Sequence, residues 1–220
     1  IVIASSHVEE SFRRDPLCYA KLFRNPYGVD TTMFRGAEPR THHGKIRFLY
    51  VGTWSLRKGC DLLTEAVKRV GNIELIHVGA VADCAFPESD SKFCHRDAVP
   101  QWGLPKYYTE ADAFVLASRE DGFGMVLGQA LANGLPVIGT DHTGVPDLAL
   151  TAALSERIFI ARHSSAESLA TILVRVRDRL LQDGPFPALS EADRDALSWS
   201  AYGRRYDAEL ARTCGWRVAA

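Results

Sequence analysis

The feature that most constrains the fold is a repeated alternation of short apolar segments with longer amphipathic ones, which begins at Lys45. The apolar segments are predicted to be buried strands, and the amphipathic segments, with apolar residues at helical spacing, are predicted to be helices. The predicted strands are 46–51, 73–78, 113–117, 135–139 and 157–160, and the predicted helices are 59–70, 105–111, 124–133 and 166–181. Buried strands joined by helices pair in parallel, so this order predicts an α/β fold with a Rossmann-like parallel sheet and helices on both faces.

The two ends of the chain depart from this alternation. The sequence opens without a methionine on 1–4, an apolar run that looks like the middle of a strand, so we expect a missing upstream domain. Gly, Pro and His are frequent over 35–44, which predicts a linker. A helical tail is predicted from two helices over 191–197 and 199–212. The expected parts are 1–44, the end of an N-terminal domain and a linker; 45–190, the sheet domain; and 191–220, helices that return toward the missing domain.

Composition excludes several classes of protein. The 220 residues are 46% hydrophobic with a formal net charge of -1, which suits one packed domain with an appendage and gives no basic surplus for nucleic acid. Five scattered cysteines without a C-x-x-C pair indicate neither a zinc site nor a disulfide framework. We therefore expect a cytoplasmic protein, and a peripheral association with a membrane surface stays open because no apolar run is long enough to cross a bilayer.

An acidic, glycine-containing turn separates the predicted strand 113–117 from the predicted helix 124–133. Glycines at 122 and 124 allow a ligand to approach the backbone closely, and the N–H groups of a first helical turn attract anions. A carboxylate beside these amides can accept hydrogen bonds from a sugar hydroxyl. The candidate residues in this segment are Asp121, with Glu120 as the alternative acid, the backbone of Gly122, Phe123, Gly124, Met125 and Val126, and Gln129 further along the helix.

Two further loops follow other strands of the predicted sheet. Gly52 and Thr53 follow the strand 46–51, and the adjacent cations Arg57 and Lys58 come just before a helix. Ligands of open α/β sheets collect beyond the carboxyl ends of the strands, so these cations are candidates for neutralising a diphosphate. The third loop carries His142, which is a candidate for ligand contact or for a purely structural role.

Glycines in the acidic turn also resemble a dinucleotide fingerprint. Gly122, Gly124 and Gly128 follow a strand and open a helix, and Asp141 ends the next strand, as a ribose-binding acid would. The glycine spacing is wrong by one, however, and at least two strand–helix units come before it. An NAD(P)-dependent oxidoreductase is therefore a minority hypothesis.

Taken in order, these segments resemble the C-terminal, donor-binding domain of retaining glycosyltransferases of family four, which have the GT-B fold. The segment 52–59 looks like the family's G…KG phosphate loop, 111–118 like its "aD.fvlPS" strand, 121–130 like "EGFG…EA", 134–138 like "GlPVI" and 143–147 like "GG.pE". The segment 25–30 is similar to the interdomain "pNGVD" and 197–199 to "fsW". The resemblance covers nearly the whole chain, and it implies that 45–190 is a nucleotide-sugar-binding domain.

The resemblance implies transfer of a sugar from a nucleoside diphosphate donor to an acceptor, with retention at the anomeric carbon. It implies that Lys58, Arg57 and the amides after Gly122 stabilise the leaving diphosphate, so that neither a metal nor a cofactor is needed. It also implies that Asp121 orients the sugar and Gln129 holds the ribose. The base would lie against a loop between Gly79 and Trp102, and the acceptor would bind the missing N-terminal domain.

Two positions depart from the family pattern. The family's pair of acids becomes Asp121 and Gln129, and the arginine that often follows the strand-end glycine is Thr53. An amide makes a weaker hydrogen bond with a ribose hydroxyl than a carboxylate does. A non-catalytic nucleotide-binding module therefore remains an alternative to an enzyme.

Overall fold

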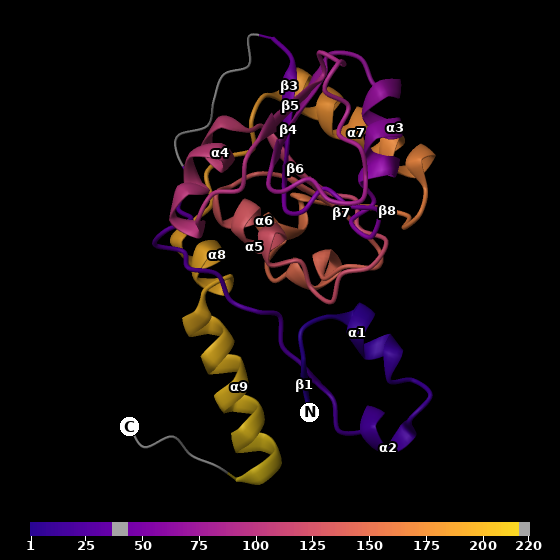
Figure 1. Ribbon diagram of the computed structural model, residues 1–220. Helices are drawn as coiled ribbons and strands as arrows, with labels where there is room; N and C mark the ends of the chain where they lie inside the picture. The colour runs from indigo at the N-terminus through magenta and orange to yellow at the C-terminus, as the bar shows by residue number, and fades with distance from the viewer. Residues whose placement is uncertain (37–43, 216–220) are drawn as a thin grey trace.

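A six-stranded parallel sheet organises the molecule, as the computed structural model of residues 1–36 and 44–215 shows (Figure 1). Its strand order is β5-β4-β3-β6-β7-β8, and every neighbouring pair is parallel. The strands are β3 (Ile46–Val51), β4 (Ile73–Val78), β5 (Phe93–Arg96), β6 (Ala113–Leu116), β7 (Val137–Thr140) and β8 (Ile158–Ala161). The predicted α/β class and parallel sheet are confirmed, whereas most of the predicted linker lies outside the described residues.

Helices cover both faces of the sheet, as predicted (Figure 1). The helices α3 (Cys60–Arg69) and α7 (Ala166–Asp183) pack against each other on one face. On the other face, α4 (Pro105–Glu110) contacts β3, and α5 (Met125–Ala132) contacts β6 and β7. Short helical turns, η1 (Gln101–Gly103), η2 (Val145–Leu148) and α6 (Ala152–Ser155), complete the connections.

The core lies between the central strands and these helices. Phe48, Leu49 and Tyr50 on β3 are completely buried, and so are Phe114 and Val115 on the neighbouring β6. Strands buried on both faces are apolar throughout and do not alternate. This burial fixes β3 and β6 side by side, and their following loops leave the same edge of the sheet.

The predicted strands and helices of the sheet domain are all present, with ends that differ by at most two residues. The two C-terminal helices are also confirmed, as α8 (Glu191–Ala196) and α9 (Trp199–Cys214). One strand of the six-stranded sheet was missed: β5 lies within the segment predicted to be a base-binding loop between Gly79 and Trp102. Its sequence, Phe-Cys-His-Arg, is mostly polar because β5 is an edge strand with partly exposed side chains, so hydrophobic periodicity did not reveal it.

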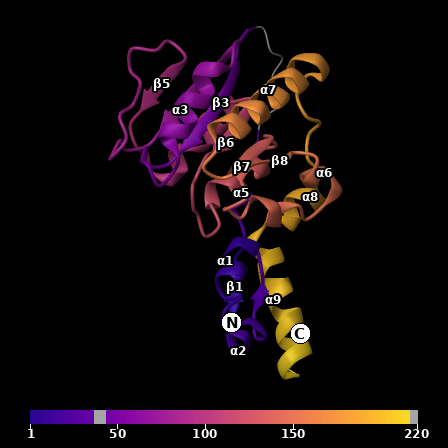
Figure 2. The same cartoon turned by 90° about the vertical axis from the view of Figure 1, so that its right-hand side faces the viewer.

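The first and last parts of the chain lie side by side below the sheet (Figures 1 and 2). The N-terminal part contains β1 (Val2–Ile3), α1 (Ser6–Ser11), α2 (Pro16–Tyr19) and β2 (Phe23–Arg24), and β1 pairs with β2. Arg205 on α9 donates from Nε to Asn25 Oδ1 at 2.7 Å and from Nη2 to the Pro26 carbonyl at 2.9 Å. Asn25 Nδ2 in turn donates to the Tyr202 carbonyl at 3.1 Å. Buried Asn25 therefore joins the two ends of the chain.

Asp147 attaches the N-terminal segment, residues 1–24, to the sheet domain. Its Oδ2 accepts from both the backbone N–H and the hydroxyl of Ser6 at 2.9 Å, and its Oδ1 lies 2.8 Å from Arg24 Nη1. The Asp147 side chain is only 4% exposed. Next to this anchor, Ser5 Oγ donates to the Gly122 carbonyl at 2.5 Å and accepts from the Val8 N–H at the start of α1. The N-terminal segment is thereby fixed against the acidic turn.

Replacement of Asp147 by alanine should release the N-terminal segment while the sheet stays folded. Loss of a buried, charged acceptor is expected to lower the free energy of unfolding by about 1–3 kcal/mol. Amide hydrogen exchange should accelerate in α1 and β2 but stay slow in β3 and β4. The matched control is Glu9→Ala, which removes only a longer contact to Arg24, at 3.4 Å. Equal exchange in α1 for Asp147→Ala and the wild type would refute the anchoring role.

Candidate functional site

A cavity of about 600 Å³ lies between the carboxyl edge of the sheet and the N-terminal segment. One wall comes from the ends of β3 and β6 and from the start of α5, and the other from the first residues of the chain. The lining residues are Ile1, Val2, Ile3, Ala4, Val8, Phe12, Tyr27, Val51, Gly52, Lys58, Leu116, Asp121, Gly122, Phe123, Gly124, Met125 and Val126. Lys58 and Asp121 are the only charged side chains among these described residues, so the cavity combines an apolar wall with one cation and one anion.

Lys58 and Asp121 form an ion pair in this cavity. Lys58 Nζ lies 2.5 Å from Asp121 Oδ2, and both side chains are 18% exposed. The loop that carries Lys58 passes so close to β6 that a Cβ atom on Gly59 would lie 2.0 Å from the Ala117 carbonyl oxygen. Gly59 also has φ of 67°, a left-handed conformation that favours glycine. This close crossing brings Lys58 to the acidic turn.

Backbone contacts hold the acidic turn from behind. The Asp121 N–H donates to the His142 carbonyl at 3.0 Å, and the Gly144 N–H donates to the Phe123 carbonyl at 2.9 Å. A Cβ atom on Gly144 would lie 2.4 Å from the Phe123 ring, so only glycine allows the two loops to pack this closely. The loop that follows β7 therefore supports the turn that carries Asp121.

The acidic turn leads directly into α5. Gly124 is the N-cap with φ of 79°, and Met125 and Val126 form the first turn beside the cavity. The N–H groups of a first helical turn have no acceptor within the helix, and they carry the positive end of the helix dipole. The cavity therefore has two sources of positive potential on one side, the Lys58 ammonium and the α5 N-terminus.

At the end of β3, Gly52 is oriented by a buried histidine. His77 Nε2 donates to the Gly52 carbonyl at 2.9 Å, since a carbonyl can only accept. Burial lowers the pKa of His77 to about 4, so the ring is neutral at pH 7 and its Nδ1 accepts from His95 Nδ1 at 2.9 Å. Gly52 thus lines the cavity with its carbonyl already engaged.

Arg119 ties the Lys58 loop to the acidic turn. Its guanidinium donates two hydrogen bonds of 2.7 Å to the carboxylate of Asp61 on α3, and its backbone N–H donates to the Arg57 carbonyl at 3.1 Å. The hydrogen bond from Arg119 lowers the pKa of Asp61. The stabilisation from this lowered pKa is present above the unfolded pKa of an aspartate, about 3.9, and is lost as the pH falls through the lower folded value.

The structure brings together eight of the residues singled out from the sequence. Lys58 and Asp121 face the same cavity, together with the predicted backbone positions Gly52, Gly122, Phe123, Gly124, Met125 and Val126. Five others lie outside this lining, namely Arg57, Thr53, Glu120, Gln129 and His142. Arg57 and Glu120 are exposed, and the Thr53 carbonyl accepts from the Tyr50 hydroxyl at 2.7 Å.

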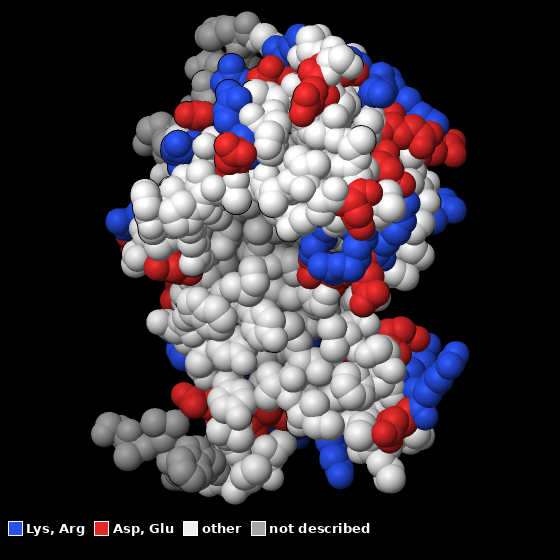
Figure 3. Space-filling model, in the orientation of Figure 1, with Lys and Arg blue, Asp and Glu red and all other residues white. Residues whose placement is uncertain are grey.

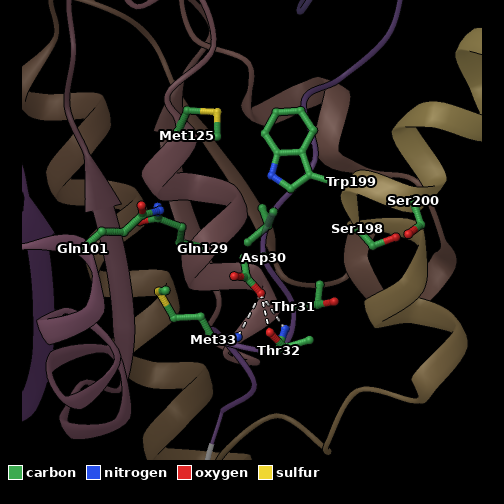
Figure 4. Close-up of a pocket in the computed structure, with 11 residues that line it drawn as sticks. Asp30, Thr31, Thr32, Met33, Gln101, Met125, Gln129, Ser198, Trp199 and Ser200 are labelled. Atoms are coloured by element: carbon green, nitrogen blue, oxygen red, sulfur yellow. Dashed lines mark hydrogen bonds between the residues drawn. The ribbon is translucent and has the colours of Figure 1, made fainter.

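Gln129 faces a second cavity of about 410 Å³, not the one that holds Asp121. Its side chain is 6% exposed, and its Oε1 accepts from the Tyr108 hydroxyl at 2.9 Å. Figure 4 shows Gln129 and Met125 on one side of this second cavity and Asp30 and Trp199 across from them. Met125 lines both cavities, so it stands between Gln129 and the ion pair.

His142 and Asp141 lie outside the lining of the larger cavity. The His142 ring is stacked on His163 with ring centroids 3.4 Å apart. Asp141 Oδ1 accepts from the backbone N–H of His163 at 2.7 Å. The acid required by the dinucleotide hypothesis is therefore occupied elsewhere, and it does not face the cavity beside Gly122 and Gly124.

The sequence did not predict the apolar wall of the cavity or the contact between Arg119 and Asp61. Phe12 of the N-terminal segment and Tyr27 just after it line the cavity, and nothing in the sequence indicated that this part of the chain folds back over the sheet. In Figure 3 the middle of the face carries mostly uncharged side chains, and charged residues gather along its right side. Arg119 directly precedes the acidic pair, but its partner Asp61 lies 58 residues away and could not be chosen from spacing.

Comparison with known proteins identifies the family. Residues 45–178, more than half of the chain, match the family model for glycosyl transferases group 1. The amylovoran biosynthesis glycosyltransferase AmsK of Erwinia amylovora is 28% identical over 153 residues, which cover 61% of this chain and 36% of AmsK. This chain therefore belongs to the glycosyl transferases group 1 family.

Solved structures show the same fold. Sucrose-phosphate synthase from Thermosynechococcus elongatus superposes with a TM-score of 0.72 at 18% identity, over 97% of this chain and 58% of the synthase. Anabaena HepE in complex with UDP gives a TM-score of 0.74 at 14% identity, over 96% of this chain and 63% of HepE. These matches confirm the resemblance to GT-B glycosyltransferases.

The chain is shorter than these relatives. Its matching part spans about a third of the length of the curated relative, at 36%. In the part of the chain that the structure describes, no helix combines the length and apolar character needed to cross a membrane.

A double-mutant cycle should measure the coupling free energy of the ion pair between Arg119 and Asp61. At pH 7 we expect a coupling of about 1 kcal/mol, near the upper end for partly exposed pairs, because the contact is bidentate. The coupling should stay constant down to about pH 5 and decrease below about pH 4, as Asp61 becomes protonated. Urea unfolding of the wild type, Arg119→Ala, Asp61→Ala and the double variant provides the measurement.

The control cycle uses Arg69 and Glu65, an ion pair one turn apart on the exposed surface of α3. We expect a coupling of only about 0.2–0.5 kcal/mol there. If the Arg119–Asp61 coupling is absent at pH 7, the two loops are not held together by this pair.

Proposed function

We propose that this chain is the donor-binding part of a retaining glycosyltransferase that uses a nucleoside diphosphate sugar. The observation that carries the proposal is the Lys58–Asp121 ion pair, which lies in a 600 Å³ cavity beside the N-terminus of α5. Membership of the glycosyl transferases group 1 family supports the reaction class. The solved complex of HepE with UDP supports a nucleoside diphosphate as the donor's leaving part.

Positive potential is concentrated where we place the diphosphate. The Lys58 ammonium and the N–H groups at the start of α5 border the same side of the cavity. Charge that develops on a leaving diphosphate is stabilised by donors that are already oriented, since no reorganisation is needed during the reaction. In this proposal these groups supply the required charge, so transfer depends on neither a metal nor a cofactor.

Asp121 is proposed to act on the sugar. In the structure its carboxylate is paired with Lys58, so donor binding would exchange this contact for two others: the ammonium with phosphate oxygens and the carboxylate with sugar hydroxyls. A carboxylate near the anomeric carbon also favours the positive charge that forms there as the glycosidic bond breaks. Asp121 thus has a role in orientation and in transition-state stabilisation.

Gln129 is not part of this proposed donor site. Its Oε1 is engaged by the Tyr108 hydroxyl, and its side chain lines the cavity on the far side of Met125. Arg57 is exposed and outside the lining, so Lys58 is the proposed phosphate cation. The functional difference between these two adjacent cations is directly testable.

The acceptor is proposed to bind outside this chain. The curated and solved relatives are longer than the part that matches, and the cavity described above has the groups for one substrate, the donor. We therefore propose that the chain binds the donor in the cytoplasm, or at a membrane surface, and that transfer requires an additional acceptor-binding domain. A non-catalytic nucleotide-binding module is the alternative, and only turnover separates the two.

Lys58→Ala should weaken UDP or GDP binding much more than binding of the matching nucleoside. Loss of a charge-assisted contact is expected to cost about 1.5–3 kcal/mol, or roughly ten- to a hundredfold in affinity. Isothermal titration calorimetry with diphosphate and nucleoside measures the difference. Arg57→Ala is the matched control and should change neither affinity by more than about twofold, since an exposed charge contributes little.

Removal of Lys58 also leaves Asp121 without its partner, which would repel a phosphate. The double variant Lys58→Ala/Asp121→Asn separates this effect from the lost cation. We expect the double variant to retain most of the loss. Full recovery of diphosphate affinity in the double variant, or equal losses for diphosphate and nucleoside, would contradict phosphate binding by Lys58.

Asp121→Asn should reduce catalysis with little change in donor affinity. Measured on the protein with its acceptor-binding domain, kcat is expected to fall more than about tenfold while UDP affinity is nearly unchanged, as for a group that acts mainly in the transition state. Glu120→Gln is the control, because Glu120 is exposed and outside the cavity. An intact kcat in Asp121→Asn with a lost kcat in Glu120→Gln would move the acid to Glu120.

A further inference from the structure

A second group of potential ligands lies behind the acidic turn, outside the donor cavity. Asp141 and His142 follow β7, and His163 follows β8. Their ligand atoms all lie within 4.8 Å of one another. We propose that Asp141, His142 and His163 bind a divalent transition-metal ion, with Zn²⁺ as the representative ion.

The three side chains lie close enough together to reach one ion. His163 Nδ1 lies 2.8 Å from Asp141 Oδ1, and the His142 and His163 rings are stacked with an interplanar angle of 12°. In a tetrahedral zinc site the ligands lie about 2.0–2.2 Å from the metal, which places ligand atoms about 3.4 Å from each other. A metal lies in the plane of each imidazole that binds it, so the two stacked rings must turn out of their nearly parallel arrangement before both can bind one ion. The Asp141 and His163 side chains are 44% and 37% exposed, so they have room to rotate.

The donor set selects the class of ion. Two imidazole nitrogens and one carboxylate oxygen suit Zn²⁺, Co²⁺ or Ni²⁺ better than Mg²⁺ or Ca²⁺, which prefer sites made of oxygen. Three protein ligands leave one coordination position for water. The site is therefore proposed for a transition metal and not for the magnesium that often accompanies nucleotides.

Neighbouring groups hold the ligands in place. The His142 ring is covered on one side by His163 and packs on the other against His7 of α1, at 4.6 Å between ring centroids. The backbone N–H of His163 donates to Asp141 Oδ1 at 2.7 Å and so orients that carboxylate from its own loop.

The proposed metal site touches the donor site only through the backbone. The His142 carbonyl accepts from the Asp121 N–H at 3.0 Å, while neither the Asp141 nor the His142 side chain lines the donor cavity. The ion would therefore stabilise the support of the acidic turn without contact with the donor. This proposal does not rest on the proposed function, because it concerns binding of the metal alone.

Calorimetric titration of the chelator-treated protein with Zn²⁺ tests the proposal. We expect one ion per chain, and His142→Ala, His163→Ala and Asp141→Asn should each weaken binding by at least about tenfold. Titration with Co²⁺, followed by its visible absorption, gives a second readout that reports coordination directly. Circular dichroism of each variant shows whether the fold is kept, and Co²⁺ absorption of His163→Ala and Asp141→Asn tests the site even where His142→Ala does not fold.

Two controls test other histidines. His95→Ala removes a partly exposed histidine whose Nε2 lies 3.7 Å from Asp97 Oδ1, and it should leave Zn²⁺ affinity unchanged. His42→Ala/His43→Ala removes the adjacent histidines in the sequence and should also have no effect. Absence of saturable Zn²⁺ binding, or Zn²⁺ affinity that survives the three ligand variants, would overturn the proposal.

Discussion

The pairing of β3 with β6 is the constraint on which the rest of the structure depends. From β3 the chain first winds outward to β4 and β5, and from β6 it winds in the opposite direction to β7 and β8. At such a reversal the loops after the two central strands leave in opposite directions and open a crevice at the carboxyl edge. Lys58 follows β3 and Asp121 follows β6, so this one strand pair brings together residues that are 63 positions apart. The close backbone approach at Gly59 and the hydrogen bonds of Arg119 then hold the loop after β3 against the loop after β6.

Local patterns in the sequence were sufficient for the sheet domain because its strands are apolar on both faces and its helices are amphipathic. The patterns failed where an element is exposed or short, as for the edge strand β5. The residues of the site were likewise predictable only where local sequence patterns determined their position. The sequence could place Lys58 and Asp121 at the carboxyl edge of the sheet, because each follows a predicted strand of a parallel sheet. The orientation of Gln129 depended on a partner from another helix, Tyr108, which sequence spacing does not identify.

The features that no local pattern revealed are contacts between distant segments. The apolar wall of the proposed donor cavity comes from the first residues of the chain, and Asp147 secures it from the loop after β7. The cluster of Asp141, His142 and His163 likewise forms only when β7 and β8 lie side by side. In both cases the chemistry is a property of the tertiary fold, because each participating segment alone carries one or two ordinary polar residues.

The junction between Asn25 and Arg205 has a consequence for how the chain reaches its native state. The two residues are 180 positions apart, so their contact closes nearly the whole chain into a loop. Closure of a loop this long costs more entropy than any contact within the sheet domain, and contacts of this kind slow folding. During synthesis the sheet can assemble as soon as its strands have emerged, whereas Asn25 must wait for α9. The junction between Asn25 and α9 is therefore expected to form last on a ribosome-bound chain, after the N-terminal segment has already docked on Asp147.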